Sequence, residues 1–474
     1  WRSRGSRGGA PSGRRLCSCH AAAQAAAPVR DVLPGGAVCL EHVFQVPLEH
    51  ARGGEGKQFE VFVREVVLLK NEGKRQELPT LLFLQGGPGF TPRRPTAATG
   101  GWLGEALKEH RVLLLDQRGT GRSTPVTAQT LQGMTAQEQA EYLLHFRADS
   151  IVRDCEVVRQ GLGVQKLNLL GQSFGGFCTL TYLSFFPSSI DTAYMTGGLA
   201  PVLQTADDVY RSTYRRVLTR NRRYYDRYPG DVRKVREVVA HLEACGGVPL
   251  PGGGRLTARR FLSLGLGLGS GGGLEDMHWL LESAFVTVEG KRELDYRFLV
   301  QVAAQQAFDT NPIYWMLHES IYCGPTTGAS RWSAHRVLQE EPFCKAFDHR
   351  AALADPEEPP IMFTGEMVYP WFAEDFATLG ALKDAAEILA AKDDWPGLYD
   401  VESLRDTEAT VAAAAYYEDM YVELAFSQEV ADLLGRKCKI WVTNEFQHSG
   451  VRDDGARILR TLMGMAKGET EIPS

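Results

Sequence analysis

The sequence predicts an α/β fold in which a doubly wound, mostly parallel sheet carries an inserted helical cap domain. Up to about Leu199, apolar segments of strand character alternate with helical segments, as the connections of a parallel sheet require. From about 201 to 405 the pattern changes to arginine- and tyrosine-rich helical stretches with glycine-rich runs, and strand character returns at 411–417. The length of 474 residues exceeds one such core and leaves room for a large insertion.

These changes of pattern divide the chain into four parts. Residues 36–200 and 406–474 are expected to form the two parts of the core, and residues 201–405 the helical cap. Residues 1–35 stand apart as a disordered or targeting segment, because the first 30 residues hold six arginines and no acidic residue. Such a composition is typical of an organellar transit peptide. We therefore expect an intracellular protein, in a plastid or mitochondrion if this segment directs transport and otherwise in the cytoplasm.

Charge and cysteine content narrow the classes of partner. Without the six arginines of the first 30 residues, the net charge falls from −6 to about −12, which argues against a nucleic-acid partner. The run Ala21–Ala27 is too short and too weakly apolar to cross a membrane, so no membrane partner is expected. Nine cysteines without regular spacing indicate reduced thiols in an intracellular compartment. The oligomeric state is left open by the sequence.

The most informative motif is the pentapeptide Gly171–Gly175, which has the form G-x-S-x-G. The apolar segment 166–170 before it predicts a buried strand, and the proline-free segment 176–185 after it predicts a helix. Strand, G-x-S-x-G and helix in this order form the nucleophile elbow of α/β-hydrolases. We therefore expect a sheet of the α/β-hydrolase type with Ser173 as its nucleophile.

Donors for an oxyanion are expected from a glycine-rich turn after an earlier strand. Residues 81–84 read as that strand, and Gln85–Gly89 follow it as Gln-Gly-Gly-Pro-Gly. The backbone N–H groups near Gly86 and Gly87 would supply one donor, and the N–H of Phe174 the other. The alternative is an ordinary Gly-Pro turn without a catalytic role.

A general base for the serine is expected near the end of the chain, since this fold places its residues in the order Ser, acid, His. His448 is the one histidine in the last hundred residues. It follows a strand-like segment that begins near Trp441 and runs into a polar loop. This position would expose the imidazole at the carboxyl edge of the sheet. A surface histidine is the alternative, and the upstream elbow favours the base.

Two carboxylates compete for the role of the acid that orients the base. Asp419 follows the strand-like segment 411–417, and Glu366 follows the segment 360–364, which also reads as a strand. Asp419 precedes His448 by 29 residues, enough for one helix and a return strand between neighbouring parallel strands. The sequence therefore favours Asp419, and Glu418 should face the opposite way in an extended chain.

Three motifs together resemble the prolyl aminopeptidases, or proline iminopeptidases, in their longer form. They are Gln85–Gly89, Asp116–Ser123 (Asp-Gln-Arg-Gly-Thr-Gly-Arg-Ser) and Gly171–Gly176, in this order. The likeness extends from about Glu41 to the C-terminal helix. This chain has Gln85 where the family usually has His, and Glu418 where Asp is more usual. We expect the first difference to tune activity, since the glycine amides remain.

The resemblance implies a serine peptidase that removes an N-terminal proline from peptides and needs no metal or organic cofactor. Its site would have to read a free amino or imino terminus, and in this family acidic cap residues have that role. Glu319, on an expected cap helix, and Glu366 fit this position. The partners implied are peptides with a free N-terminal proline. A solvated helix residue is the alternative for Glu319.

Two other functions use the same residues. One is a different serine hydrolase, such as an esterase, for which paired cap carboxylates would have no purpose. The other is a binding protein that retains the triad without turnover. The sequence leaves open the strength of the proline preference, the accepted peptide length and the physiological substrates.

Overall fold

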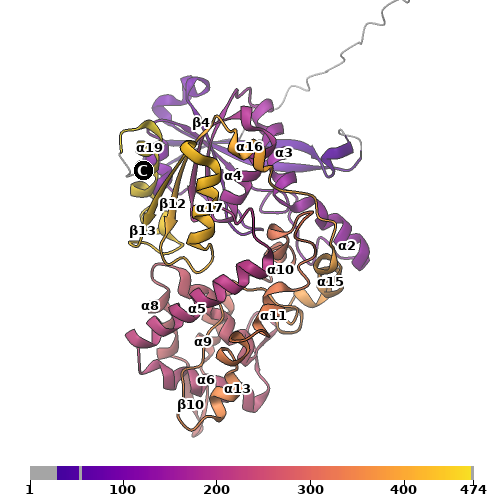
Figure 1. Ribbon diagram of the computed structural model, residues 1–474, viewed down its shortest axis with the longest axis vertical. Helices are drawn as coiled ribbons and strands as arrows, with labels where there is room; N and C mark the ends of the chain where they lie inside the picture. Colours follow the sequence, from indigo (N-terminus) through magenta and orange to yellow (C-terminus); the bar gives the residue numbers. More distant parts are fainter. Residues whose placement is uncertain (1–28, 53–55, 471–474) are drawn as a thin grey trace, which may run out of the picture.

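The computed structural model describes residues 29–52 and 56–470, and within them a mixed sheet forms the core (Figure 1). Its strands lie in the order β1-β2-β3-β5-β4-β6-β7-β12-β13. The pairs from β1 to β5 are antiparallel and those from β5 to β13 are parallel. The strands are β1 Arg30–Leu33, β2 Ala37–Pro47, β3 Gln58–Leu68, β4 Thr80–Leu84, β5 Arg111–Leu115, β6 Leu167–Gln172, β7 Ile190–Thr196, β12 Thr410–Tyr416 and β13 Cys438–Thr443.

Helices cover both faces of the sheet, which explains the continuous apolar runs of β4 and β5. In β4, Leu81 and Phe83 face one layer of the core, while Leu82 and Leu84 face the other. One layer contains α1 (Gly101–Ala106) and α19 (Gly455–Lys467), which pack together. The other contains α3 (Ala148–Gly161), α4 (Phe174–Phe185), α2 (Ala136–Leu143) and α17 (Leu424–Leu434).

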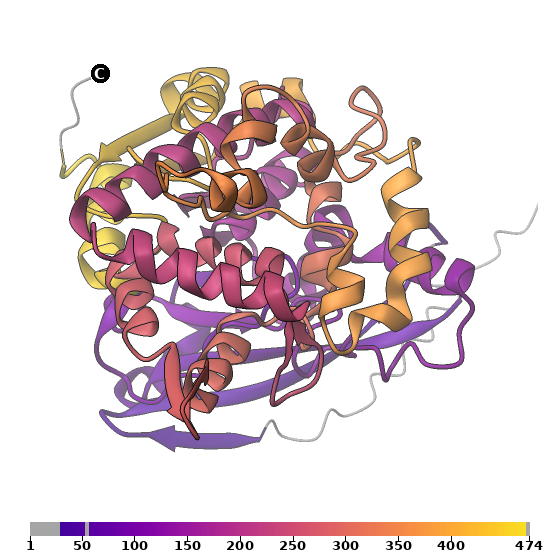
Figure 2. The ribbon, with the colours of Figure 1, turned by 90° about the horizontal axis from the view of Figure 1, so that it is seen from below.

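The chain between β7 and β12 forms a second body of helices below the core in Figure 1. Seen from below in Figure 2, its magenta and orange helices lie in front of the sheet. Its longest helix, α5, begins with a capping box at Thr205 and runs over Ala206–Arg227. Further helices are α6 Asp231–Cys245, α7 Ala258–Leu262, α8 Gly273–Glu282, α9 Tyr296–Gln305, α10 Pro312–Met316, α11 Ser333–Leu338, α12 Phe343–Ala346, α13 His349–Ala354, α14 Phe372–Asp375, α15 Lys383–Ala391 and α16 Val401–Arg405.

The second body also contains two small hairpins, β8–β9 (Val248–Pro249 and Arg255–Leu256) and β10–β11 (Phe285–Val288 and Lys291–Leu294). The Leu-Gly run at 264–269 lies in a 3₁₀ helix, Ser263–Gly269. Near its C-terminal end, the chain between β7 and β12 returns to the core, where α15 packs on α2 and α16 packs on α4.

One expected strand does not form. Residues 360–364 are extended, but within the described chain they pair with no strand. Their backbone is bound by a side chain of α5 instead. The N–H of Phe363 donates to Asn221 Oδ1 (2.8 Å), and Asn221 Nδ2 donates to the carbonyl of Phe363 (2.9 Å). The apolar pattern therefore reflects burial of an extended segment in the cap, and the prediction of a strand there is wrong.

Near the N-terminus, β1 lies inside the segment 1–35 that the sequence set apart, and it pairs with β2. The expected transit peptide falls largely on residues 1–28, which lie outside the described residues. Among the helices of the described chain, none combines the length and the apolar content needed to cross a bilayer.

Candidate active site

Ser173 lies at a sharp turn between β6 and α4. Its backbone has φ 55° and ψ −125°, a conformation that non-glycine residues rarely adopt. Close packing enforces the turn, because a Cβ on Gly175 would overlap the carbonyl oxygen of Leu84 at the end of β4. A Cβ on Gly176 would likewise overlap the backbone of Gly198. The serine is thus held out of the sheet by backbone contacts, as a nucleophile elbow requires.

Backbone hydrogen bonds join the carboxyl ends of four neighbouring strands. The N–H of Ser173 donates to Thr196 O at the end of β7 (3.0 Å), and Gly197 N donates to Ala414 O of β12 (2.9 Å). Tyr417 N, just after β12, donates to Thr443 O of β13 (2.9 Å). The loops that follow β6, β12 and β13 therefore start from one rigid edge.

The acid and the base that the sequence favoured meet at this edge. Asp419 Oδ2 lies 2.7 Å from His448 Nδ1, and both residues are buried. The other oxygen of Asp419 accepts the N–H groups of Tyr421 (2.9 Å) and Val422 (3.1 Å). With the carboxylate fixed in this way, Nδ1 is the natural donor and Nε2 is left to accept a proton. The ring of Tyr421 packs edge-on against the imidazole at 4.7 Å.

The chain that follows β7 lies against both the imidazole of His448 and the backbone of Ser173. A Cβ on Gly197 would lie 3.0 Å from His448 Nδ1, and one on Gly198 would lie 2.7 Å from Ser173 O. His448 therefore borders Gly197, and the backbone of Ser173 borders the neighbouring Gly198. Ser173 is partly exposed to solvent, whereas His448 is buried.

The glycine-rich turn after β4 lies directly against the elbow. A Cβ on Gly86 would come within 2.9 Å of Ser173 Cβ and 2.7 Å of Gln172 Oε1. The turn is fixed by Gln117, whose Nε2 donates to Gln85 O (3.0 Å). Phe174, the first residue of α4, is buried behind the serine. The turn that carries Gly86 therefore borders Ser173 next to Phe174, in the region where the predicted oxyanion donors are expected.

The charged turn 116–123 is braced by ion pairs and hydrogen bonds of its own residues. Asp116 accepts two hydrogen bonds from Arg94 (2.7 and 2.6 Å) and one from Arg122 N (2.9 Å). Arg118 is buried and pairs with Asp154 of α3. These contacts fix the turn beside the oxyanion loop.

Glu366 lies close enough to His448 and Asp419 for their charges to interact. Burial raises the pKa of Glu366 to about 7, while the positive charge of His448 and a hydrogen bond from Tyr314 oppose this rise. Tyr314 Oη donates to Glu366 Oε1 at 2.6 Å. In this geometry Asp419, and not Glu366, lies within hydrogen-bond distance of His448, which leaves Glu366 as a second, half-buried carboxylate near the imidazole.

Glu319 is engaged by the backbone of the cap. Its two carboxylate oxygens accept the N–H groups of Ser333 and Ala334, each at 2.9 Å, at the N-terminus of α11. Burial raises the pKa of Glu319 to about 7 although these hydrogen bonds lower it. The negative charges of Glu319 and Glu366 both raise the pKa of Tyr210 and that of Tyr322. The two carboxylates therefore lie near the same aromatic side chains.

An unbroken series of aromatic contacts connects these parts, and of its members only Phe174 was predicted to belong to the site, through its backbone N–H. Ring contacts run from the oxyanion loop through the cap to the elbow, over Phe90, Tyr314, His318, Tyr322, Phe177 and Phe174. The spacing of 314, 318 and 322 at i, i+4 and i+8 was a usable signal for one shared face.

Within the described residues, no cluster of three or more His, Cys, Asp or Glu side chains could hold a metal ion.

The chain is similar to several proteins of known family. Residues 79–234 match the family model described as the alpha/beta hydrolase fold. The chain is 46% identical to a proline iminopeptidase of Aeromonas sobria, over 92% of this chain and 98% of that protein. It is 34% identical to a proline iminopeptidase of Aspergillus aculeatus, over 91% of this chain and 94% of that protein. A tripeptidyl aminopeptidase of Streptomyces coelicolor is 28% identical over 31% of this chain.

Proposed function

Because the chain belongs to the family of proline iminopeptidases with the α/β-hydrolase fold, we propose that it releases N-terminal proline from peptides as a serine aminopeptidase. The observation that carries this proposal is the position of Glu366. A half-buried carboxylate within electrostatic reach of His448 suits a substrate whose cationic terminus lies one residue from the bond that is cut.

Acylation starts with Ser173. Its Oγ attacks the carbonyl carbon of the N-terminal proline while His448 Nε2 takes the hydroxyl proton. Asp419 keeps the imidazole in the tautomer that can accept this proton and then stabilises the imidazolium. The amides near Gly86, Gly87 and Phe174 hold the negative oxygen of the tetrahedral intermediate.

The intermediate collapses when the bond between the proline carbonyl and the next nitrogen breaks. His448 gives its proton to the leaving nitrogen, and the shortened peptide departs with a new amino terminus. Water then attacks the acyl-enzyme, with His448 as base, and releases proline and the free serine.

We assign the recognition of the terminal amine to Glu366 as the direct contact and to Glu319 as a second negative charge. The contacts of Glu319 with α11 support this division, because both of its oxygens already accept backbone N–H groups. Tyr314 orients the Glu366 carboxylate through its hydroxyl. The aromatic rings around Glu366 give a pyrrolidine ring an apolar surface to contact.

The test compares hydrolysis of prolyl anilide, its N-acetylated form and alanyl anilide by the full chain. We expect cleavage of the free prolyl anilide and loss of cleavage on acetylation. Ser173→Ala should abolish turnover, with a fall of at least about 10⁴-fold. Glu366→Gln should raise KM for the free substrate more than it lowers kcat, because it removes an ionic contact with the ground state.

Three outcomes would contradict the proposal. Equal cleavage of the acetylated anilide would exclude amine recognition by Glu366. Cleavage of simple esters that is indifferent to Glu366→Gln would indicate an esterase. Tight binding of a prolyl compound without turnover would indicate a binding protein that keeps the triad.

A further inference from the structure

Helix α5 presents a row of arginines at one face, at positions 216, 220, 223 and 227. Each of them contacts a different part of the cap or of the core. Arg216 pairs with Glu423 and Arg223 pairs with Glu418, both in the second part of the core. Arg220 donates to the carbonyl of Leu268 (2.8 Å) and Arg227 pairs with Glu275 (2.7 Å), both within the cap.

The two core partners lie on either side of the triad acid. Glu418 directly precedes Asp419, and Glu423 is the N-cap of α17, four residues after it. We call residues 417–423 the acid loop. Two arginines of one cap helix therefore reach the two ends of the loop that carries Asp419.

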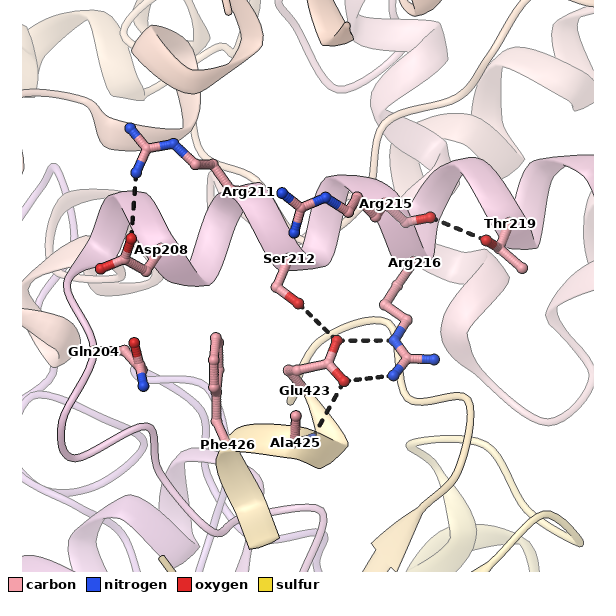
Figure 3. A pocket seen from close by; sticks show the side chains of 10 residues that line it. All are labelled: Gln204, Asp208, Arg211, Ser212, Arg215, Arg216, Thr219, Glu423, Ala425 and Phe426. Carbon is pink, nitrogen blue, oxygen red and sulfur yellow. Dashed lines mark hydrogen bonds and ion pairs between the residues drawn. The ribbon is translucent and has the colours of Figure 1, made fainter. Parts of the chain in front are cut away.

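Glu423 is the more completely held of the two. Figure 3 shows its carboxylate between Arg216 and Ser212 of α5, in the groove that separates α5 from α17. Arg216 donates through Nε (2.8 Å) and Nη2 (2.5 Å), and Ser212 Oγ donates at 2.7 Å. The Glu423 side chain is only 6% exposed. Removal of Arg216 would thus leave a buried carboxylate without its cation, which a buried site tolerates poorly.

Short-range hydrogen bonds connect these ends to Asp419. The carboxylate of Asp419 is held by the N–H groups of Tyr421 and Val422, and Val422 is bonded directly to Glu423. The hydrogen bonds to Glu423 raise the pKa of Arg216, and the charge of Asp419 adds to this effect. A shift of Glu423 must therefore move the amides that hold the triad acid.

We propose that Arg216 and Arg223 are positioning residues through which cap helix α5 holds the acid loop, so that Asp419 stays in register with His448. The inference rests on the proposed function, because it gives Asp419 the role of triad acid. It makes the cap a support of the catalytic machinery as well as a cover that binds substrate.

The principal test is Arg216→Ala, with Arg215→Ala as its matched control. Arg215 is the adjacent residue of α5, is exposed, and makes no ion pair within the described chain. A displaced triad acid lowers the rate of the chemical step, so kcat for prolyl anilide should fall about 10- to 100-fold with KM little changed. Arg215→Ala should keep wild-type kcat. Arg216→Lys, which keeps the charge without the bidentate contact, should fall between the two.

Combination with Asp419→Asn separates positioning from general structural damage. If Arg216 acts through Asp419, the change Arg216→Ala should lower kcat no further once Asp419→Asn is present. If the double variant shows a loss of kcat equal to the product of the two single losses, the proposal is overturned. A kcat for Arg216→Ala equal to that of Arg215→Ala would also overturn it. Glu423→Gln provides a second variant if Arg216→Ala does not fold, and it should lower kcat in the same way.

The same experiment tells the two proposals apart. Wild-type protein that does not cleave prolyl anilide, or Asp419→Asn with full activity, would refute the proposed function itself. An active wild type and an impaired Asp419→Asn, together with an unaffected Arg216→Ala, Arg223→Ala and Glu423→Gln, would refute only the role of α5.

Discussion

Glu319 offers a quantitative test of how the cap is held together. The change Glu319→Gln removes a buried negative charge and one of two acceptors at the N-terminus of α11. The amide oxygen of Gln can accept only from Ser333 or Ala334, so one backbone N–H is left without a partner. That loss costs about 1–3 kcal/mol of unfolding free energy and does not depend on pH.

The pH-dependent part follows from the pKa, which burial raises from 4.5 to about 7. The folded state then binds the proton more tightly than the unfolded state, so Glu319 favours folding at low pH. This contribution is fully present below about pH 4.5 and is lost as the pH rises through about 7. At 1.36 kcal/mol per pKa unit the full change is about 3.4 kcal/mol, of which about 2.5 kcal/mol falls between pH 5 and pH 8.

The assay is urea unfolding of wild type and Glu319→Gln at pH 5 and pH 8, without substrate. Subtraction of the unfolding free energies of the two proteins cancels the contributions from titration of all other groups. We expect the variant to gain about 2.5 kcal/mol relative to wild type on going from pH 5 to pH 8. The exposed Glu402→Gln serves as a control that should show no such gain. A constant difference between wild type and Glu319→Gln would refute the reasoning, because Glu319 would then titrate alike in both states.

Two further predictions concern the reaction. Gly86→Ala should lower kcat by about 10²–10³-fold, since a Cβ 2.9 Å from Ser173 Cβ displaces an oxyanion donor. Gly230→Ala, which meets nothing within 4 Å, should keep wild-type kcat, and equal activity of both variants would exclude this placement of the turn. Since burial raises the pKa of Glu366 to about 7, inhibition by the product proline should weaken about tenfold from pH 8 to pH 6. Glu366→Gln should bind proline weakly at both pH values, and an unchanged pH dependence in that variant would show that another group is responsible.

The fold class is confirmed, and the reason lies in how parallel sheets are buried. Strands covered on both faces must be continuous apolar runs, and residues 81–84 and 111–115 have that pattern. The same pattern failed at 360–364, because an apolar run also fits an isolated extended segment. Its partner there is Asn221, a side chain 142 residues away, which no local pattern could identify.

The site was less open to prediction from sequence than the fold. Chain order and a spacing of 29 residues were enough to propose that Asp419 and His448 meet, since neighbouring parallel strands deliver both to one edge. The partners of Glu319 were beyond reach, because they depend on how α11 presents its first N–H groups. The spacing of Tyr314 and His318 suits a packed core as well as a binding surface.

The division of the site between two bodies determines which part of the chain could be exchanged in protein engineering. The proposed chemistry belongs to loops of the sheet, whereas the residues proposed to read the substrate come from the insertion between β7 and β12. New selectivity could therefore be sought by exchanging that insertion between homologous enzymes while the sheet is retained. A graft of this kind would need a first helix whose cations match Glu418 and Glu423, or the exchanged enzyme would recognise its new substrate and fail to turn it over.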